Sequence, residues 1–396
     1  MFKNAYIPYK GYFSTPFSKW QMTLANEHSL VFGASTAARW LQGKNIDPTG
    51  FDYLYVGYTV HQRQAFYAAP WVAALIGATG TTGAAVSQAC STATTCVYNA
   101  AAGIENGLYT NTFIMTADRC SNGPHIVWPN PNGPGGEVLH ENWMMDNFGS
   151  DPVAKGAMIQ TAETVSKEMG ATKEEADELT ARRYEQYNDA LANDREFQKR
   201  YFFPAEVRIS KKKTVVLDQD EGITPTTLES LKGLGPVLPG GILSFGTQTH
   251  PADGNASLIV ATREKAKALS ADPSVEIQVC SYGYSRAAKG CMPKAPVPAA
   301  NMALQKAGIS VADVKAIKTH NPFIANDLYM AKEMGLDANT FNNYGSSLVF
   351  GHPQGPTIAR TLIELIEELV IKGGGYGLVT GCAAGDTGAA LVVKVG

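Results

Sequence analysis

Strands and helices alternate along two long stretches of the chain, and this alternation restricts the possible fold more than any other feature of the sequence. In the first stretch, the predicted strands are 53–57, 84–87 and 112–116, and the predicted helices are 64–76 and one that starts at Cys90. In the second stretch, the predicted strands are 256–260, 276–282, 314–319, 376–380 and 389–395, and the predicted helices are 301–307, 323–334 and 357–372. Such alternation indicates an α/β fold, and the two stretches suggest two similar halves.

The segment between these stretches, residues 118–246, does not show this alternation of strands and helices. Residues 122–136 are rich in Asn, Pro and Gly and are predicted to form a loop. Amphipathic helices are predicted at 152–169 and 173–193. We therefore predict three parts, which are an N-terminal half at 1–117, a loop domain at 118–246 inserted in or after that half, and a C-terminal half at 247–396.

The composition argues against several classes of protein. Of the 396 residues, 44% are hydrophobic and 17% are charged, which favours a large buried core. The formal net charge of −3 argues against a nucleic-acid binder, because that role requires a basic surface. No apolar run reaches the ~18 residues of a membrane span, and the first residues do not read as a secretion signal. The six Cys form no C-x-x-C pair, so we expect reduced thiols in a cytoplasmic protein.

Cys90 is the first candidate for chemistry, because it lies where a predicted strand ends and a predicted helix begins. A thiol at a helix N-terminus faces unpaired N–H groups, which can lower its pKa from about 8.5 into the range of roughly 3.5–7.5. The alternative is a small buried Cys without a chemical role. Cys96, Cys120, Cys280 and Cys291 are assigned to that alternative.

Three further residues lie in segments that are typical of functional sites. His352 lies in a Gly-His-Pro loop, where it is a candidate base for a nucleophilic Cys. His320 follows a predicted strand, at the end where α/β proteins usually place their sites. Cys382 precedes a glycine-rich turn whose backbone N–H groups could hold an oxyanion. Each also has a structural interpretation, as a loop cap for His352, a core His for His320 and an incidental thiol for Cys382.

Together these motifs resemble the thiolase family, and they follow the order that the family has. The segment Cys90-Ser91-Thr92-Ala93 resembles the motif of the family's nucleophile, and Gly351 to Arg360 resembles its G-H-P-x-G-x-S/T-G-x-R stretch. Further resemblances are Met158 to Glu163 with the M-x-x-T-A-E segment of the loop domain, Asp220-Glu221 with an Asp-Glu pair, and Asp253-Gly254 with an N-D-G-A-A stretch. The matches are spread over nearly the whole chain.

The resemblance implies the thiolase fold, with two βαβαβαββ halves in five αβαβα layers and an inserted loop domain. It also implies an acyltransferase that cleaves a 3-oxoacyl-CoA with coenzyme A, or runs the reverse Claisen condensation. Coenzyme A is then a substrate, and neither a cofactor nor a metal is implied.

The same resemblance implies roles for individual residues. Cys90 would be the nucleophile with His352 as its base, His320 and His352 would hold the enolate oxygen, and Cys382 would be a second acid-base. The backbone N–H groups of Cys90 and Ala384 would hold the tetrahedral oxyanion. Met158, Thr249 and Phe323 would contact the substrate or coenzyme A.

The chain departs from the family pattern at three places. The segment His320-Asn321-Pro322-Phe323 replaces the Asn-Glu-Ala-Phe of many thiolases, Cys382-Ala383-Ala384-Gly385 replaces Cys-x-Gly-Gly, and an Arg that often follows the Asp-Glu pair is missing. Relatives with a His in place of the Asn often work with a small OB-fold subunit that carries a zinc ribbon. Such a partner is therefore expected, beside a homodimer or higher oligomer of the chain itself.

The substrate is indicated by large side chains in the middle segment. Aromatic and Met residues gather there at Trp128, Trp143, Met144, Met145, Phe148 and Met158, which suggests a bulky or aromatic acyl group. The chain resembles the thiolases of anaerobic toluene breakdown, which cleave 2-benzoylsuccinyl-CoA to benzoyl-CoA and succinyl-CoA. The alternatives are an acetyl-CoA acetyltransferase for short aliphatic substrates, a non-catalytic acyl-CoA-binding relative, and a synthase-type condensing enzyme. Cys382 argues against the last, because such enzymes lack the second acid-base Cys.

Overall fold

Eleven strands form one mixed sheet in the computed structural model, which describes residues 2–396. They are β1 (Tyr6–Ile7), β2 (Tyr12–Ser14), β3 (Ser18–Lys19), β4 (Tyr53–Gly57), β5 (Thr82–Val86), β6 (Asn111–Arg119), β11 (Ala252–Ala261), β12 (Ile277–Arg286), β13 (Val314–His320), β14 (Gly375–Ala383) and β15 (Thr387–Val395). The main path of the sheet is β13-β14-β15-β12-β1-β11-β6-β4-β5, and β2 and β3 also pair with β11.

The helices that pack on this sheet are α1 (Ser29–Gly43), α2 (Ala68–Ile76), α3 (Thr92–Glu105), α8 (Arg263–Leu269), α9 (Pro296–Ala307), α10 (Ile324–Met334), α11 (Ser347–Phe350) and α12 (Gly355–Ile371). The middle segment contains α4 (Trp143–Gly149), α5 (Met158–Met169), α6 (Lys173–Lys199), α7 (Leu228–Lys232) and two hairpins, β7 (His125–Pro129) with β8 (Val138–Asn142) and β9 (Ala205–Ser210) with β10 (Lys213–Leu217). Within the described residues, no helix combines the length and the apolar character that crossing a membrane requires.

The two halves of the sheet repeat one topology. In the first half, β4 runs parallel to β6, and both β6 and β2 pair antiparallel with β11. In the second half, β13 runs parallel to β14, and both β14 and β12 pair antiparallel with β15. The short strand β1 pairs with β11 and with β12 and joins the halves. The predicted pair of similar α/β halves is confirmed by this repeat.

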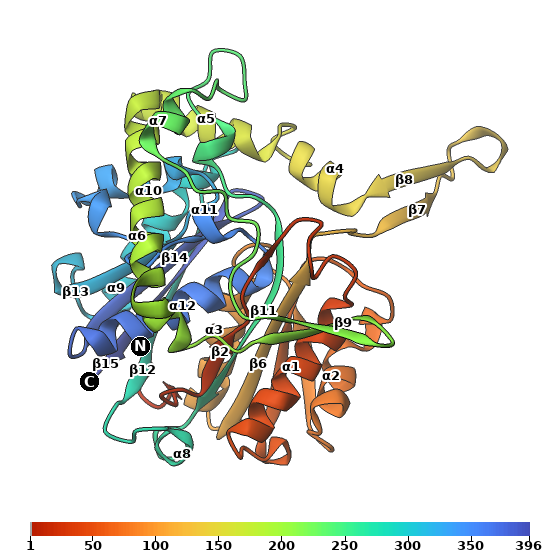
Figure 1. Cartoon of the computed structure of the whole chain (residues 1–396), viewed down its shortest axis with the longest axis vertical. Helices are drawn as coiled ribbons and strands as arrows, with labels where there is room; N and C mark the ends of the chain where they lie inside the picture. Colours follow the sequence, from red (N-terminus) through yellow and green to blue (C-terminus); the bar gives the residue numbers. More distant parts are fainter. Residues whose placement is uncertain (1) are drawn as a thin grey trace.

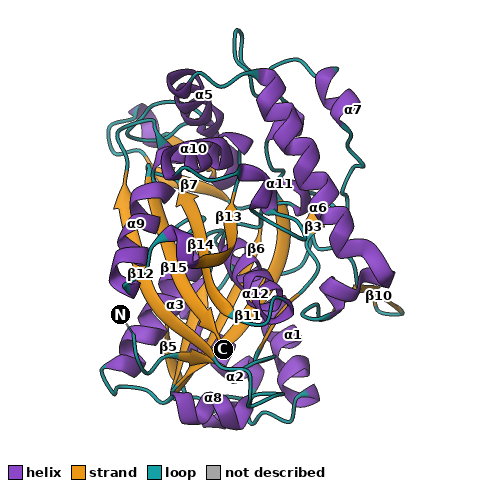
Figure 2. Ribbon diagram, turned by 90° about the vertical axis from the view of Figure 1, so that its left-hand side faces the viewer, coloured by secondary structure: helices purple, strands orange, loops and turns teal. Residues whose placement is uncertain are grey.

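Helices and strands stack in five layers (Figure 1), with helices on both sides of the strands in Figure 2. The central layer is α3 and α12, whose apolar side chains share one core with Ile114 of the first half and Val379 of the second. Phe113 and Met115, the neighbours of Ile114 on β6, point the other way and pack under α1 and α2. The helices α9 and α10 cover the outer face of the second half. The predicted αβαβα arrangement is therefore confirmed, and the strands are apolar because both of their faces are buried.

Two segments differ from the predictions made from the sequence. Residues 122–136 are not only a loop, because β7 pairs antiparallel with β8 in a hairpin that projects away from the body (Figure 1). The Pro and Gly residues that suggested a loop gather mostly in the turn of this hairpin, so the prediction was wrong for the strand before it. The helix α1 was not predicted, although Leu30, Ala34 and Leu41 lie buried on one of its faces.

The strand pairing also moves the boundary between the halves. Although β11 follows the inserted segment in the chain, it pairs with β6 from Asp253 to Ala261. The second half therefore starts after Ala261 rather than at residue 247. Residues 118–246 interrupt the first half, because β11 has to return across the insertion to complete its sheet.

A buried ion pair ties the inserted segment to the central helix α12. The guanidinium of Arg360 donates to both carboxylate oxygens of Asp220 at 2.6 and 2.8 Å and to Glu364 at 3.0 Å. Its flat face lies 3.6 Å from the ring centre of Phe350. Asp220 also accepts from the hydroxyl of Tyr187 at 2.9 Å. The Asp of the Asp-Glu pair and the Arg that closes the Gly-His-Pro stretch are thus partners across the fold.

We predict that Arg360→Ala lowers the free energy of unfolding by about 3–5 kcal/mol, because it leaves the buried carboxylate of Asp220 without its cation, whereas Glu364 keeps Lys318 at 3.3 Å. The matched control is Arg182→Ala, which removes an exposed pair with Glu185 on α6 and should cost at most about 1 kcal/mol. Chemical denaturation followed by circular dichroism measures both. Equal losses for the two variants would contradict the assignment.

Candidate active site

Cys90 lies on a tight turn between β5 and α3. Ala89, the residue before it, has a φ of 44°, a left-handed conformation that side chains other than Gly rarely adopt. The turn is held by Thr92, whose hydroxyl donates to the carbonyl of Ala89 at 2.7 Å and accepts from the N–H of Gln88 at 2.8 Å. The strained turn presents Cys90 ahead of the helix, so its thiol faces a cavity and not the helix interior.

His352 contacts the Cys90 thiol directly. Its Nε2 lies 3.1 Å from Cys90 Sγ, and its Nδ1 lies 2.6 Å from the hydroxyl of Thr357. Gln354 adds a second acceptor, with its Oε1 at 3.3 Å from the same sulfur. The short loop that carries His352 leads into α12, so the central helix sets the distance between base and thiol. Nucleophilic catalysis requires a thiol next to a base whose orientation is fixed by a third group. Here the base is His352 and the third group is the Thr357 hydroxyl.

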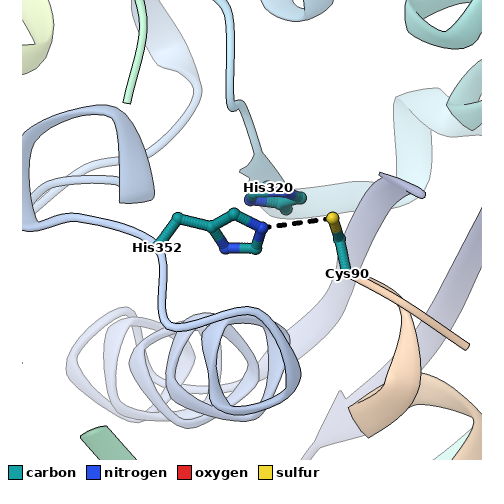
Figure 3. A group of neighbouring side chains, drawn as sticks. All are labelled: Cys90, His320 and His352. Atoms are coloured by element: carbon teal, nitrogen blue, oxygen red, sulfur yellow. Dashed lines mark hydrogen bonds between the residues drawn. The ribbon is translucent and has the colours of Figure 1, made fainter. Parts of the chain in front are cut away.

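His320 completes the group from the end of β13. Its ring centre lies 4.1 Å from that of His352, and Figure 3 shows both rings next to the Cys90 sulfur. One ligand atom from each of the three residues lies within 4.8 Å of the other two. Among residues 2–396, this is the one group of three such side chains close enough to hold a metal ion. A metal there would occupy the lone pairs that a nucleophile and a base use.

Cys382 and Ala384 come from the end of β14 and the turn after it. The Cys382 thiol is fully buried, and burial raises its pKa well above the usual value, with the nearby Cys90 adding to the shift. Cys382 does not line the cavity, whereas Ala384 does. The backbone N–H groups of Ala384 and of Cys90 itself act to lower the pKa of the Cys90 thiol. These two groups are therefore the candidate donors to a negative charge that forms beside this sulfur.

The protonation state of the pair differs from the expectation. Burial raises the pKa of the Cys90 thiol to about 12, although the two N–H donors oppose the shift. Burial also lowers the pKa of His352 to about 3, and it lowers the pKa of His320 well below its usual value. The expected lowering of the Cys90 pKa by the helix N-terminus was wrong, because removal of water outweighs the helix dipole here. At neutral pH the site therefore rests as a neutral thiol beside two neutral imidazoles.

A cavity of about 430 Å³ opens above Cys90 and is mostly apolar. Its lining includes all three residues expected to contact substrate, Met158, Thr249 and Phe323. Of the large side chains noted in the middle segment, Trp143, Met144, Phe148 and Met158 line it. Trp128 does not, because it lies on the projecting strand β7, and Met145 faces solvent.

Several residues at the site were missed by the sequence reasoning. Asp118, at the end of β6, accepts from the N–H groups of Thr59, Val60 and Gly355 at 2.8–3.0 Å. It thereby fixes the residue that follows Gln354, although burial raises its pKa to about 7. A carboxylate directly after a buried strand was the available signal for Asp118. Ser347 and Thr357 are ordinary hydroxyl residues, and only their contacts with the two His rings distinguish them.

We predict that alkylation of Cys90 by iodoacetamide is faster at pH 9 than at pH 7. The thiolate is the reactive form, and below a raised pKa its fraction grows about tenfold for each pH unit. Mass spectrometry of the modified peptide measures the rate, and Cys90→Ser, which keeps the five buried cysteines, gives the background. A rate that is already constant from below pH 7 would indicate a thiolate–imidazolium pair and would contradict the neutral resting state.

Comparison with known proteins agrees with this fold and with this motif order. The thiolase N-terminal domain family matches residues 12–264, and the thiolase C-terminal domain family matches residues 274–395. The division between the two matches falls after β11, where the strand pairing also places it. A probable acetyl-CoA acetyltransferase of Mycobacterium leprae is 28% identical over 96% of this chain and 97% of its own length.

Other relatives are similar over part of their length or in fold. The acetyl-CoA acetyltransferase of Escherichia coli is 33% identical, over 59% of this chain and 59% of its own length. Among solved structures, the acetyl-CoA acetyltransferase of Bacillus anthracis superposes with a TM-score of 0.90 at 25% identity, covering 100% of this chain and 99% of that one. Human mitochondrial 3-ketoacyl-CoA thiolase gives a TM-score of 0.91 at 24% identity, with the same coverage. Two family matches that together span nearly the whole chain, and a fold shared from end to end, show that this chain belongs to the thiolase family of acyltransferases.

Proposed function

We propose that this chain cleaves a 3-oxoacyl-CoA with coenzyme A, or runs the reverse Claisen condensation, through an acyl group carried on Cys90. The observation that carries this proposal is the 3.1 Å contact between Cys90 Sγ and His352 Nε2 at the base of the cavity. The relatives named acetyl-CoA acetyltransferase and 3-ketoacyl-CoA thiolase support the reaction class. The presence of Cys382 and of an ordered nucleophile argues against a non-catalytic or a synthase-type relative.

In the first half of the reaction, the Cys90 thiol gives its proton to His352 and the sulfur attacks the 3-keto carbon. The N–H groups of Cys90 and Ala384 hold the tetrahedral oxyanion, and one such donor is typically worth about 10²–10³ in rate. Collapse breaks the carbon–carbon bond and leaves an acyl-Cys90 thioester and an enolate. His320 and protonated His352 hold the enolate oxygen, and Cys382 gives its proton to the enolate carbon.

In the second half, the Cys382 thiolate takes the proton of incoming coenzyme A. The new thiolate attacks the acyl-Cys90 thioester, and the same two N–H groups hold the second oxyanion. The Cys90 sulfur leaves and takes back the proton held by His352. At the end of the cycle, Cys90, His352 and Cys382 are all neutral again, as they are before substrate binds.

For the substrate, we propose a bulky acyl group, with 2-benzoylsuccinyl-CoA as the first compound to test. Trp143, Met144 and Phe148 bring an apolar wall from α4 to the cavity above Cys90, which suits a ring better than a single methyl group. The names of the relatives favour a second candidate, an acetyl-CoA acetyltransferase acting on short aliphatic chains.

We predict that Cys90→Ala abolishes turnover and the acyl-enzyme adduct, because Cys90 is the one thiol of residues 2–396 that lines the cavity, whereas Cys382 is fully buried behind the lining. The control is Cys280→Ala, which removes a buried thiol from β12 and should retain activity. Intact-mass spectrometry after mixing with an acyl-CoA detects the adduct. An adduct of equal yield on Cys90→Ala would refute the assignment of the nucleophile.

We predict higher kcat/KM for 2-benzoylsuccinyl-CoA than for acetoacetyl-CoA, and a loss of about tenfold for the aromatic substrate in Phe148→Ala, with little change for the short one. Product analysis by mass spectrometry across a 3-oxoacyl-CoA panel measures both. Turnover of acetoacetyl-CoA without turnover of 2-benzoylsuccinyl-CoA would favour the second candidate.

The assembly and the compartment are proposals from the family resemblance. We propose a homodimer or higher oligomer in the cytoplasm, with a small OB-fold zinc-ribbon subunit as its partner. Light scattering and assays of the chain alone and with candidate partners test the assembly, and cell fractionation tests the compartment.

A further inference from the structure

Ser347, the first residue of α11, is the one protein group that hydrogen-bonds to the His320 side chain among the described residues. Its Oγ lies 2.9 Å from His320 Nδ1. The other ring nitrogen, Nε2, is buried and has no hydrogen-bond partner within residues 2–396. His320 Nε2 is thus the free functional atom of this ring, and whether it carries a proton decides whether it can donate or accept.

The surroundings of Ser347 restrict where its own proton can go. Asn321 donates from its side-chain Nδ2 to Asp327 at 2.7 Å, which turns its Oδ1 toward Ser347 and toward the N–H of Leu348 at 3.2 Å. The backbone N–H of Asn321 donates to Ser347 Oγ at 3.2 Å. The hydroxyl oxygen therefore already accepts one bond, and its proton has two acceptors, His320 Nδ1 at 2.9 Å and Asn321 Oδ1 at 3.2 Å.

These two choices give opposite tautomers of a neutral ring. If Ser347 donates to Nδ1, the ring proton has to be on Nε2. If Ser347 donates to Asn321, the ring proton is on Nδ1 and Nε2 is a bare acceptor. The shorter contact leads to Nδ1, and Asn321 Oδ1 already accepts from Leu348. The first arrangement therefore gives the Ser347 proton its shorter bond and leaves only the Nε2–H of His320 without a partner among the described residues, free for the substrate.

We propose that Ser347 is a positioning residue that holds neutral His320 as the Nε2–H tautomer and so makes it a hydrogen-bond donor to the substrate oxygen. The donor role rests on the proposed function. The neighbouring ring is held the opposite way, since His352 Nε2 has to accept from Cys90 and its Nδ1–H then donates to Thr357. The His352 Nε2 thus accepts a proton, whereas the His320 Nε2–H donates a hydrogen bond. The hydroxyls of Thr357 and Ser347, which contact the Nδ1 atoms, favour these tautomers.

The hydrogen-bond network that orients Ser347 extends to the inserted segment. Asp327, which orients Asn321, is fully buried and accepts from the guanidinium of Arg183 on α6 at 2.9 Å. It also accepts from the hydroxyl of Thr319 at 2.5 Å, next to His320 on β13. Satisfied networks of this kind hold one arrangement of donors and acceptors.

The tautomer can be measured without substrate. In ¹⁵N-labelled full-length protein, long-range ¹H–¹⁵N spectra of the imidazoles distinguish Nε2–H from Nδ1–H, and His320→Asn assigns the His320 signals. We expect Nε2–H in the wild type and a mixture with Nδ1–H in Ser347→Ala. A wild-type Nδ1–H ring, or a ring unchanged in Ser347→Ala, would overturn the proposal.

Kinetics provide a second test, because a general loss of structure would change KM and Cys90 alkylation as well as kcat. We expect Ser347→Ala to lower kcat for carbon–carbon cleavage by about 10²-fold, the low end for loss of one oxyanion donor. The KM and the rate of Cys90 alkylation should stay unchanged, because the nucleophile and its base are not altered. The matched control is Ser346→Ala, which removes the adjacent buried hydroxyl, a group without a hydrogen-bond partner in the described part of the chain. Ser347→Thr should restore most of the rate.

A double variant separates this role from a direct one. The amide of His320→Asn donates without any choice of tautomer, so adding Ser347→Ala to it should cost almost nothing more. Additive losses in the double variant would overturn the proposal. If the wild type cleaves no 3-oxoacyl-CoA, the proposed function fails, whereas the tautomer spectra still decide the role of Ser347.

Discussion

The buried contact of Arg360 with Asp220 and Glu364 is the interaction on which the rest of the structure depends. It lies on α12, the helix between the two sheets, and it holds the inserted segment, which approaches that helix through Asp220. A guanidinium without contact with water is tolerated only because its donors meet carboxylates and its flat face meets Phe350. The N-terminus of the same helix follows His352, so the position of the base depends on this anchor.

Burial also decides the chemistry of the site. Taking Cys90, His320 and His352 out of water favours their neutral forms. A site of neutral groups has no preformed charge, and it must move protons along hydrogen bonds that already exist. The contacts of the two imidazoles with Thr357 and Ser347 then become as important as the catalytic atoms, because they determine which nitrogen donates and which accepts.

Much of the fold could be predicted from the sequence, because apolar alternation and helical spacing are local signals. The strands at 53–57 and 314–319 and the helix at 357–372 were found within a few residues of β4, β13 and α12. Errors arose where local signals mislead. Residues 122–136 combine turn residues with a strand of the projecting hairpin, and α1 has many small residues that weaken its periodicity. The boundary at residue 247 was wrong because pairing of β11 with β6 is a contact across more than a hundred residues.

The sequence by itself indicated the family through the order of its motifs, and the order of the layers followed from that resemblance. It also indicated Cys90, His320 and His352, since motif order is a property of the chain. Only the tertiary structure decided the protonation state of Cys90 and the partners of His320. Both depend on how completely water is removed and on which hydroxyl lies behind each ring. Cys90, His320 and His352 come from segments more than two hundred residues apart in the chain at their widest, and α12 between the sheets brings them together. Desolvation and hydrogen-bond direction are properties of that assembled site, and no local pattern of residues contains them.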